Sequence, residues 1–367
     1  MKTAKILLAA LIITGIFGGS CLAAPSDSAR SSVLIDGASG KIIFEKNARE
    51  RLGPASTTKI MTALVALENM PPETKIKVDP RAVGVEGSSA YLRAGDEYTL
   101  SELIYAMMLS SANDAAAAIA YAVGGDIGGF ADMMNEKANR LGLCDTHFEN
   151  PHGLDGEEHF TTAYDLALIA RAALGNELFR AVVSTKNTTI GKGETCRALH
   201  NHNRLLFEYD DIIGVKTGFT KRCGRTLVSA ARRDGVTLIC VTLGDGDDWR
   251  DHRRLLDAGF ELYENVTVCE KNDIFLTVRV CGGENEKIGV TNDEIIQLYL
   301  PKNRGEIKVR FELPEFVYAP VTAGDIIGRA VFSLDGEDIA SAELISVSDC
   351  PKTQKKNFFE RLLPWKK

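Results

Sequence analysis

The chain has 367 residues, of which 45% are hydrophobic and 25% charged, and its formal net charge is -7. This composition is that of a soluble globular protein long enough for two domains, or for one large domain with an appendage. The acidic balance argues against nucleic acid as a partner, because a nucleic-acid binder needs a basic face.

The first 23 residues have the pattern of a secretory signal peptide. In MKTAKILLAALIITGIFGGSCLAAP two lysines precede an apolar run, and Cys21 and Ala23 occupy the small-x-small positions of a cleavage site. We therefore expect cleavage after Ala23 and an exported protein. The alternative is an uncleaved anchor helix, but the apolar run is short for one. Lipidation of Cys21 would need a branched aliphatic residue where Gly18 stands.

Seven cysteines follow the signal peptide, an odd number that cannot pair completely within one chain. Their spacing contains no C-x-x-C and no zinc-ribbon pattern. We therefore expect mostly free, buried thiols. The seven are Cys144, Cys196, Cys223, Cys240, Cys269, Cys281 and Cys350.

From residue 31 onward the chain begins with a hairpin and continues with helices. Apolar and β-branched runs flank a Gly-Ala-Ser-Gly turn in 31–47, which predicts the hairpin. Helical periodicity follows, and Thr161 or Thr162 is the expected cap of the last helix in this group. The helices are predicted around Ser56 and at 101–123, 129–141 and 161–174.

Three apolar strands with short turns come next, followed by a helix over 247–266. The strands are predicted at 211–219, 225–233 and 236–246. A hairpin, an all-helical middle and three more strands indicate one antiparallel sheet built from both ends of the segment, with helices packed on it. The expected fold class is α+β.

From about residue 266 the pattern changes to short alternating runs separated by Gly, Pro and Asn, which predicts a small all-β domain. We place the first domain at 24–265, the all-β domain at 266–350 and a separate tail at 351–367.

The tail has a basic amphipathic pattern that suits a membrane surface. Phe358, Phe359, Leu362 and Leu363 fall on one helical face among lysines and arginines, and Trp365 follows them. A solvated basic tail is the alternative interpretation.

A serine and a lysine stand three residues apart where the first helical pattern begins. Ser56 and Lys59, at i and i+3, project from the same side of a helix, so their side chains can meet. A serine hydroxyl needs a base to become a nucleophile. At the first turn, free N–H groups and the helix dipole favour the negative charge that develops on attack. For this pair alone, an ordinary helix cap is the better interpretation.

Two further motifs change that interpretation. Ser111-Ala112-Asn113 lies at a predicted helix start, and Lys216-Thr217-Gly218 lies on a predicted strand. Separately they could be a capping serine with a turn asparagine, and an exposed strand lysine. All three motifs in this order, each in a suitable element, form a strong signal for an active-site serine.

The chain resembles the penicillin-binding protein and β-lactamase superfamily, and more narrowly the serine-type D-alanyl-D-alanine carboxypeptidases. The resemblance rests on PASTTKIMTAL, SSANDAAAAIA, MNEKANRLGLCDTHFENPHGLD, NHNRLL and GVKTGFT, together with the signal peptide, the all-β domain and the tail. It implies a β-lactamase/transpeptidase-like domain, an antiparallel sheet flanked by helices, followed by the small all-β domain.

The resemblance also implies a role for each motif. Ser56 would attack the carbonyl of the penultimate D-alanine of a peptidoglycan stem peptide, with Lys59 as the base. Ser111 would relay a proton to the leaving D-alanine, and Asn113 would orient the substrate amide. Penicillins would acylate the same serine, so β-lactams are the expected inhibitors.

The strand motif would bind the other end of the substrate. The resemblance implies that Lys216 and Thr217 meet the terminal carboxylate, while Gly218 lets the strand backbone approach. The backbone N–H groups of Ser56 and Phe219 would form the oxyanion hole. Arg250, in the helix after the third strand, is a further candidate for the carboxylate, and a solvated arginine is the alternative.

Other classes remain as alternatives. A class A β-lactamase would carry a Glu-x-x-x-Asn motif where FENPHGLDGEEHF stands. A zinc peptidase is opposed because H-E-x-x-H is absent and His147, His152 and His159 lack helical ligand spacing. A D,D-endopeptidase of the same family and a non-enzymatic wall-binding protein are also open. We expect no metal, no cofactor and no nucleic acid, and a location at the outer face of the bacterial cytoplasmic membrane.

Overall fold

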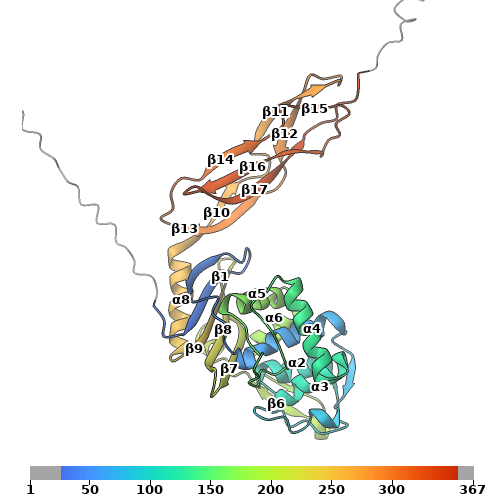
Figure 1. Ribbon diagram of the computed structural model, residues 1–367, viewed down its shortest axis with the longest axis vertical. Helices are drawn as coiled ribbons and strands as arrows, with labels where there is room; N and C mark the ends of the chain where they lie inside the picture. The colour runs from blue at the N-terminus through green and yellow to red at the C-terminus, as the bar shows by residue number, and fades with distance from the viewer. Residues whose placement is uncertain (1–25, 354–367) are drawn as a thin grey trace, which may run out of the picture.

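The computed structural model describes residues 26–353, which form a mixed helical and sheet body followed by an elongated β body (Figure 1). The predicted signal peptide, residues 1–23, and residues 354–367 of the predicted amphipathic tail lie outside the described residues. The α+β class and the following all-β domain that the sequence predicted are confirmed.

The first body is built on a five-stranded antiparallel sheet with the strand order β2-β1-β9-β8-β7. Strand β1, near the start of the body, pairs with β9 near its end, so that Val33 lies opposite Val241. The predicted hairpin and the predicted three-stranded meander therefore join in one sheet. Its strands are β1 (Ser31–Asp36), β2 (Ile42–Lys46), β7 (Ile212–Thr220), β8 (Gly224–Arg233) and β9 (Val236–Asp245).

Both faces of this sheet are covered, which explains why its strands are nearly continuous apolar runs in the sequence. Val33 and Ile35 of β1 pack into the large core shared with the helical layer. Leu34, between them, points to the opposite face. There it packs in one cluster with Leu255 and Leu256 of α8 (Asp248–Leu262). The sheet thus separates a thick helical layer from a single long helix (Figure 1).

The helical layer contains the predicted helices and one that the sequence did not reveal, α6. The layer consists of α1 (Lys59–Asn69), α2 (Leu100–Leu109), α3 (Asn113–Gly124), α4 (Ile127–Arg140), α5 (Ala163–Leu174) and α6 (Glu177–Ser184). Thr162 is the N-cap of α5, because its Oγ1 accepts a hydrogen bond from the backbone N–H of Asp165 at 3.0 Å. The remaining short elements of this body are β3 (Lys75–Lys77), β4 (Glu97–Thr99), β5 (Asn187–Ile190), β6 (Arg197–His200) and α7 (Leu205–Glu208).

The helix predicted over 101–123 is two helices, α2 and α3. Ser111 adopts a left-handed backbone conformation with φ of 58°, which a right-handed helix cannot continue. Ala112 is extended and precedes the first turn of α3. The break places Ser111 on a corner between two helices, where its hydroxyl can reach the neighbouring strand.

The second body has its own core and a six-stranded sheet in the order β14-β16-β17-β12-β11-β15, in which only the β11–β15 pair is parallel. A two-stranded ribbon, β10 with β13, lies between this sheet and α8 (Figure 1). The strands are β10 (Tyr263–Cys269), β11 (Phe275–Cys281), β12 (Lys287–Asn292), β13 (Ile296–Pro301), β14 (Lys308–Glu312), β15 (Phe316–Tyr318), β16 (Ile326–Leu334) and β17 (Glu337–Ser346).

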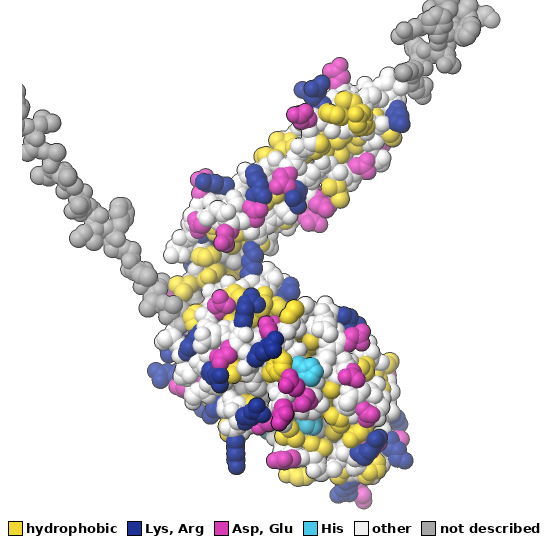
Figure 2. All heavy atoms as spheres, viewed as in Figure 1, with side chains coloured by type: hydrophobic (Ala, Val, Ile, Leu, Met, Phe, Trp, Pro, Cys, Tyr) yellow, Lys and Arg dark blue, Asp and Glu magenta, His cyan; other side chains and the backbone are white. Residues whose placement is uncertain are grey.

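The surface and the thiols give two further findings for residues 26–353. No helix in this part is long and apolar enough to cross a membrane. Acidic and basic side chains are interspersed on the face that Figure 2 shows. All seven thiols there are unpaired, but only Cys240, Cys269 and Cys350 are buried, so the expectation of mostly buried thiols was wrong.

Candidate active site

The three sequence motifs meet at one cavity of about 390 Å³ beside the edge strand β7. Its wall comes from the turn before α1, the corner between α2 and α3, the strands β7 and β8, and the start of α8. The lining residues are Ser56, Ser88, Ser111, His202, Thr217, Gly218, Phe219, Arg225, Asp248 and Trp249.

Ser56 lies on a 3₁₀ turn, Ala55–Thr58, that leads directly into α1. The turn begins with Ala55 in a left-handed conformation, φ 50°, which is uncommon for a residue with a Cβ atom. Such strained conformations cluster at functional sites, where the surrounding structure holds them in place. The serine side chain makes no cap hydrogen bond to the helix. Its Oγ instead faces Lys59.

Lys59 is fully buried behind the serine. Its Nζ donates to Ser56 Oγ at 3.0 Å and to the backbone carbonyl of His152 at 2.5 Å. Burial lowers the pKa of this amine well below its usual value, the nearby Lys216 lowers it further, and Asp114 opposes the shift. A lysine in this environment is driven toward the neutral amine, which can accept the proton of the serine hydroxyl.

Ser111 and Lys216 form a second pair on the other side of the cavity. Lys216 Nζ donates to Ser111 Oγ at 3.1 Å and to the backbone carbonyl of Thr217 at 2.8 Å. Burial lowers the pKa of Lys216 to about 7, so both protonation states are populated near neutral pH. This pair can therefore carry charge and pass a proton.

Gly218 allows β7 to lie directly against the turn that carries the serine. A Cβ atom at this position would stand 2.9 Å from the backbone nitrogen of Ser56 and 2.4 Å from Oγ1 of Thr226. Phe219, the next residue, is 64% exposed at the mouth of the cavity. The backbones of Ser56 and of the strand thus approach as closely as the absence of a side chain permits.

Asn113 is buried at the first turn of α3 and does not line the cavity. Its Nδ2 donates to the backbone carbonyl of Glu86 at 2.5 Å. Its Oδ1 is buried and has no hydrogen-bond partner within the described residues. A buried acceptor without a partner is rare and marks a place where a ligand or a water can bind.

Arg250 also lies outside the cavity lining, and it is exposed to solvent. Its side chain is 72% exposed and lies 3.8 Å from Asp247 in a surface ion pair. Arg250 follows Asp248 by two positions on α8, which corresponds to a rotation of about 200° around the helix. Because Asp248 lines the cavity, Arg250 points away from it. The exposure of Arg250 agrees with the alternative interpretation of this residue, a solvated arginine.

The Asn-Pro-His-Gly segment, residues 150–153, contacts the start of α1 and the turn before it, a role that the sequence did not reveal. The carbonyl of His152 binds Lys59, and the carbonyl of Pro151 accepts a 2.6 Å hydrogen bond from Thr62 of α1. Gly153, with φ 85°, packs so tightly that a Cβ atom would stand 1.9 Å from the carbonyl oxygen of Ala55. This segment therefore packs against the turn that carries Ser56 and holds it in place.

The rings of His152 and His159, in the same connection, hydrogen-bond to neighbouring residues. Burial lowers the pKa of His152 to about 3 and that of His159 to about 4, so both rings are neutral at physiological pH. His159 Nε2 lies 2.9 Å from the hydroxyl of Thr58, next to α1. Across residues 26–353, no group of three His, Cys, Asp or Glu side chains is arranged to hold a metal ion.

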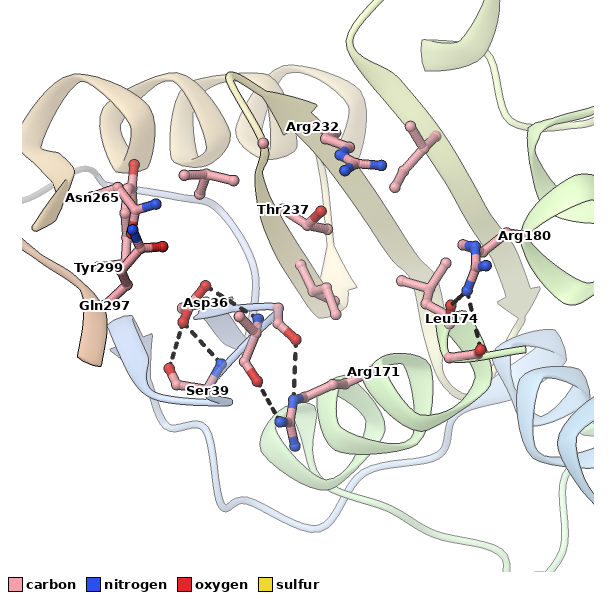
Figure 3. Close-up of a pocket in the computed structure, with 17 residues that line it drawn as sticks. Asp36, Ser39, Arg171, Leu174, Arg180, Arg232, Thr237, Asn265, Gln297 and Tyr299 are labelled. Atoms are coloured by element: carbon pink, nitrogen blue, oxygen red, sulfur yellow. Dashed lines mark hydrogen bonds between the residues drawn. The ribbon is translucent and has the colours of Figure 1, made fainter. Parts of the chain in front are cut away.

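A larger hollow of about 640 Å³ lies at the opposite end of the sheet, beside the β10–β13 ribbon (Figure 3). Asp36, Arg171, Arg180, Arg232 and Tyr299 are among its lining residues. Arg171 and Arg180 donate to backbone carbonyls there, so their guanidinium groups serve the local fold. None of the predicted site residues lines this hollow, and the candidate site is the smaller cavity at Ser56.

Comparison with known proteins finds two family models that together match most of the chain. A family model for D-alanyl-D-alanine carboxypeptidase matches residues 20–247, and one for the C-terminal domain of penicillin-binding protein 5 matches residues 263–352.

The chain is 31% identical to the D-alanyl-D-alanine carboxypeptidase DacF of Bacillus subtilis, over 91% of this chain and 89% of the relative. It is 34% identical to DacC of Escherichia coli, over 92% and 88%. The crystal structure of penicillin-binding protein 5 from Haemophilus influenzae matches with a TM-score of 0.77 at 30% identity, over 89% of this chain and 99% of the other. The chain therefore belongs to the family of serine-type D-alanyl-D-alanine carboxypeptidases.

Proposed function

We propose that the protein removes the terminal D-alanine from peptidoglycan stem peptides ending in D-Ala-D-Ala, through an acyl-enzyme on Ser56. One observation carries the proposal: Ser56 Oγ lies 3.0 Å from the Nζ of Lys59, whose burial favours the neutral amine. The family supplies the substrate class, since the relatives DacF and DacC are both D-alanyl-D-alanine carboxypeptidases.

In the acylation step, Ser56 Oγ forms a bond to the carbonyl carbon of the penultimate D-alanine while its proton passes to Lys59 Nζ. Negative charge develops on the carbonyl oxygen. The backbone N–H groups of Ser56 and Phe219 stabilise this charge, and the close approach of β7 at Gly218 supports their pairing.

Collapse of the tetrahedral intermediate breaks the C–N bond to the terminal D-alanine. The leaving amine needs a proton, and Ser111 delivers it from Lys216, which lies 3.1 Å away. Proton exchange with bulk water returns Lys59 to the neutral amine and Lys216 to the ammonium. Neutral Lys59 then takes a proton from the water that attacks the ester carbonyl and gives it to Ser56 Oγ as the ester C–O bond breaks, which releases the serine and the shortened peptide. No metal or cofactor takes part in these steps.

The remaining residues hold the substrate. The unpartnered Oδ1 of Asn113 supports a role in accepting an N–H of the substrate backbone. Lys216 and the hydroxyl of Thr217 supply positive charge and a donor toward the substrate carboxylate. Arg250 has no place in this proposal, because its side chain is 72% exposed and lies in a surface ion pair with Asp247.

Penicillins acylate the same serine in this proposal, because they offer a reactive amide and a carboxylate to the same two ends of the cavity. No glutamate lines the cavity within the described residues, so no carboxylate of the β-lactamase type stands ready to activate water. The penicilloyl-enzyme is therefore expected to decay slowly. Fast turnover of penicillin would favour the β-lactamase alternative instead.

The protein acts outside the cytoplasm in this proposal. Residues 1–23 direct export, 24–265 form the catalytic domain, 266–350 the β domain, and 351–367 attach the chain to the outer face of the membrane. The amphipathic pattern of the tail supports this attachment. Truncation after Lys352 is expected to release the protein from membrane fractions. An unchanged bound fraction would overturn the attachment.

The decisive assay for the reaction is D-alanine release from diacetyl-L-Lys-D-Ala-D-Ala. We expect release by the wild type with and without EDTA, and no release above background by Ser56→Ala. Ser184→Ala, which removes a surface hydroxyl from α6, is the matched control and should retain full activity. Loss of release on adding EDTA, or activity surviving in Ser56→Ala, would overturn the proposal.

A further inference from the structure

Two buried aspartates lie on either side of the part of α8 that lines the active-site cavity. Asp245, the last residue of β9, is 3% exposed, and the side chain of Asp251, in the first turn of α8, is 4% exposed. Asp248 and Trp249, which line the cavity, stand between them in the sequence. Because a buried carboxylate is costly unless it is paired or hydrogen-bonded, the two side chains need an explanation that the reaction at Ser56 does not give.

Ser28, from the segment that precedes β1, bridges the two carboxyl groups. Its Oγ lies 2.7 Å from Oδ1 of Asp245 and 2.7 Å from Oδ2 of Asp251, and its backbone N–H donates to the same Oδ2 at 2.6 Å. A serine hydroxyl has one hydrogen to donate. Two hydroxyl contacts of this length therefore require a second hydrogen, and a carboxyl group that keeps its proton supplies it.

The contacts assign that proton to Asp245. Asp251 accepts two hydrogen bonds from Ser28 and lies 3.6 Å from Nη1 of Arg254, so its surroundings stabilise a negative charge. Asp245 accepts the backbone N–H of Asp247 at 3.1 Å, but its Oδ2 is buried without a hydrogen-bond partner in the described chain. Burial raises the pKa of Asp245, and the nearby Asp251 adds to the rise, although hydrogen bonds to the carboxyl group oppose it. For Asp251, the hydrogen bonds from Ser28 outweigh burial and lower the pKa.

The charged groups around the pair leave Asp245 without a cation. Arg225 lies opposite Asp245 in the register of β8 and β9, but its guanidinium binds Asp248 at 3.0 Å. Lys46 of β2 binds Asp27 instead, at 3.1 Å. Other titratable groups near the pair are Asp27 before β1, Cys240 of β9, Asp247 before α8, and His252 and Arg254 of α8. Within residues 26–353 no salt bridge reaches Asp245, which agrees with a neutral carboxyl group.

We infer that Asp245, Ser28 and Asp251 share one proton in a chain of hydrogen bonds that positions the α8 wall of the active-site cavity. Asp245 Oδ1 donates its proton to Ser28 Oγ, and the Ser28 hydroxyl donates to the ionised Asp251. The chain joins the end of β9 to α8 across the link that carries Asp248 and Trp249. Its three members are positioning residues, since their side chains do not line the cavity. The inference extends the proposed function, and its activity measurement rests on that function.

The shared proton makes this connection sensitive to alkaline pH. Because the pKa of Asp245 is raised in the folded protein, the stabilisation is complete at low pH and is lost as the pH rises through that folded pKa. Above it, two buried carboxylates face each other across Ser28, whose hydroxyl can donate to one of them at a time. We therefore expect the link between β9 and α8 to loosen there.

The fluorescence of Trp249 measures the position of the α8 wall. Trp365 is the other tryptophan of the chain, so Trp365→Phe is the parent protein for these measurements. From about pH 5 to about pH 9 we expect an emission shift in the parent that is smaller in Asp245→Asn, whose amide cannot ionise and still donates to Ser28 Oγ. The cavity lysines titrate in both proteins, so the difference between the two curves isolates Asp245. Ser28→Ala, which breaks the chain at every pH, should show near pH 5 the emission that the parent reaches near pH 9.

Acylation by a fluorescent penicillin is the second measurement. We compare second-order rate constants as the ratio of variant to parent, because the ionisation of Lys59 and Lys216 is common to both proteins. For Asp245→Asn this ratio should increase by about threefold or more between about pH 5 and about pH 9, since even a displacement of about 1 Å can cost on the order of 100-fold in rate. Asp132→Asn, which removes an exposed carboxylate from α4, is the matched control, and its ratio should not change with pH.

Asp251→Asn distinguishes the two carboxyl groups. It removes the ionised acceptor, so we expect its melting temperature near neutral pH to fall by about 5 °C or more. Asp245→Asn should melt at or above the temperature of the parent, and its advantage should grow as the pH rises. Equal destabilisation by both variants at every pH would show that Asp245 is an ordinary ionised acceptor, and the inference would be wrong.

The outcomes separate the inference from the proposed function. If the wild type is not acylated by penicillin, the proposed function fails, while the fluorescence and melting measurements still decide the inference. If the wild type is acylated but the curves of Asp245→Asn and the parent stay parallel over the whole pH range, with both proteins folded, the inference fails alone.

Discussion

Replacing Gly218 by alanine perturbs the site in a way whose size follows from the structure. The new Cβ atom would stand 2.9 Å from Ser56 N and 3.1 Å from Thr57 N, whereas ordinary contacts begin at 3.4 Å. The Ser56 nitrogen is backbone and cannot rotate away. The strand and the nucleophile turn must therefore separate by at least about 0.5 Å, the difference between 2.9 and 3.4 Å.

The same Cβ atom would stand 2.4 Å from Thr226 Oγ1, a hydroxyl that donates to the carbonyl of Pro54 at 3.0 Å. Rotating Thr226 away costs that hydrogen bond, about 1 kcal/mol. A misplacement of about 1 Å can cost on the order of 100-fold in rate, so we expect acylation of Gly218→Ala to be slower by about 10- to 100-fold. Stability should fall by about 1–3 kcal/mol through overpacking.

The assay is the second-order rate constant for acylation by a fluorescent penicillin, with D-alanine release measured in parallel. Gly128→Ala is the control, since a Cβ atom there meets nothing closer than 3.5 Å on the exposed side of α4. Acylation of Gly218→Ala within threefold of the wild type, in a variant with an unchanged melting temperature, would refute the argument that a bare strand backbone at Gly218 is required.

Two further predictions concern the surroundings of the nucleophile. Gly153→Ala should displace the Ser56 turn, abolish most acylation by penicillin and destabilise the fold by about 3 kcal/mol or more, because its Cβ atom would stand 1.9 Å from the Ala55 carbonyl. Gly142 has a similar positive φ but lies in open space, so Gly142→Ala is the control. It should lower the free energy of unfolding in chemical denaturation by only about 1 kcal/mol and leave acylation unchanged. Equal effects of the two variants would show that the tight packing at Gly153 is not the cause. Burial lowers the pKa of Lys216 to about 7 in the folded protein, whereas in the unfolded chain this amine keeps its proton up to about pH 10.4. Between these two pH values the unfolded state binds more protons, so Lys216 should raise the free energy of unfolding by on the order of 4 kcal/mol as the pH rises. The free energy of unfolding, measured with urea at pH 7 and pH 9.5, should lose this rise in Lys216→Met. The same pH dependence in the wild type and the variant would contradict a buried amine that titrates near 7.

The sequence was sufficient to predict the contact between Ser56 and Lys59, because that geometry is local. Three residues of separation bring Ser56 and Lys59 together across one turn, and the structure gives a 3.0 Å contact. The strand motif was also recognisable, since apolar runs on both sides of Lys216 predicted β7. The α+β class followed from the order of hairpin, helices and strands.

The parts that sequence reasoning missed depend on contacts between distant segments. Lys59 donates to the carbonyl of His152, 93 positions away, and no side-chain pattern encodes a backbone acceptor. The break between α2 and α3 depends on the left-handed conformation of Ser111, a residue that helices and turns both accept.

The position of Arg250 could not be predicted from the sequence for a similar reason. Arg250 stood near the expected place in the sequence, but the direction of its side chain depends on where α8 begins. Since α8 starts at Asp248, that acidic residue faces the cavity and Arg250 faces solvent.

The most direct test of the central claim, that Ser56 is the nucleophile with Lys59 as its base, is mass spectrometry of the purified protein after exposure to penicillin. We expect one penicilloyl group per chain, located on the peptide that contains Ser56 and absent from Ser56→Ala. Formation of this adduct should be much slower in Lys59→Met, which lacks the base. An adduct on another residue, or none on the folded wild-type protein, would contradict it.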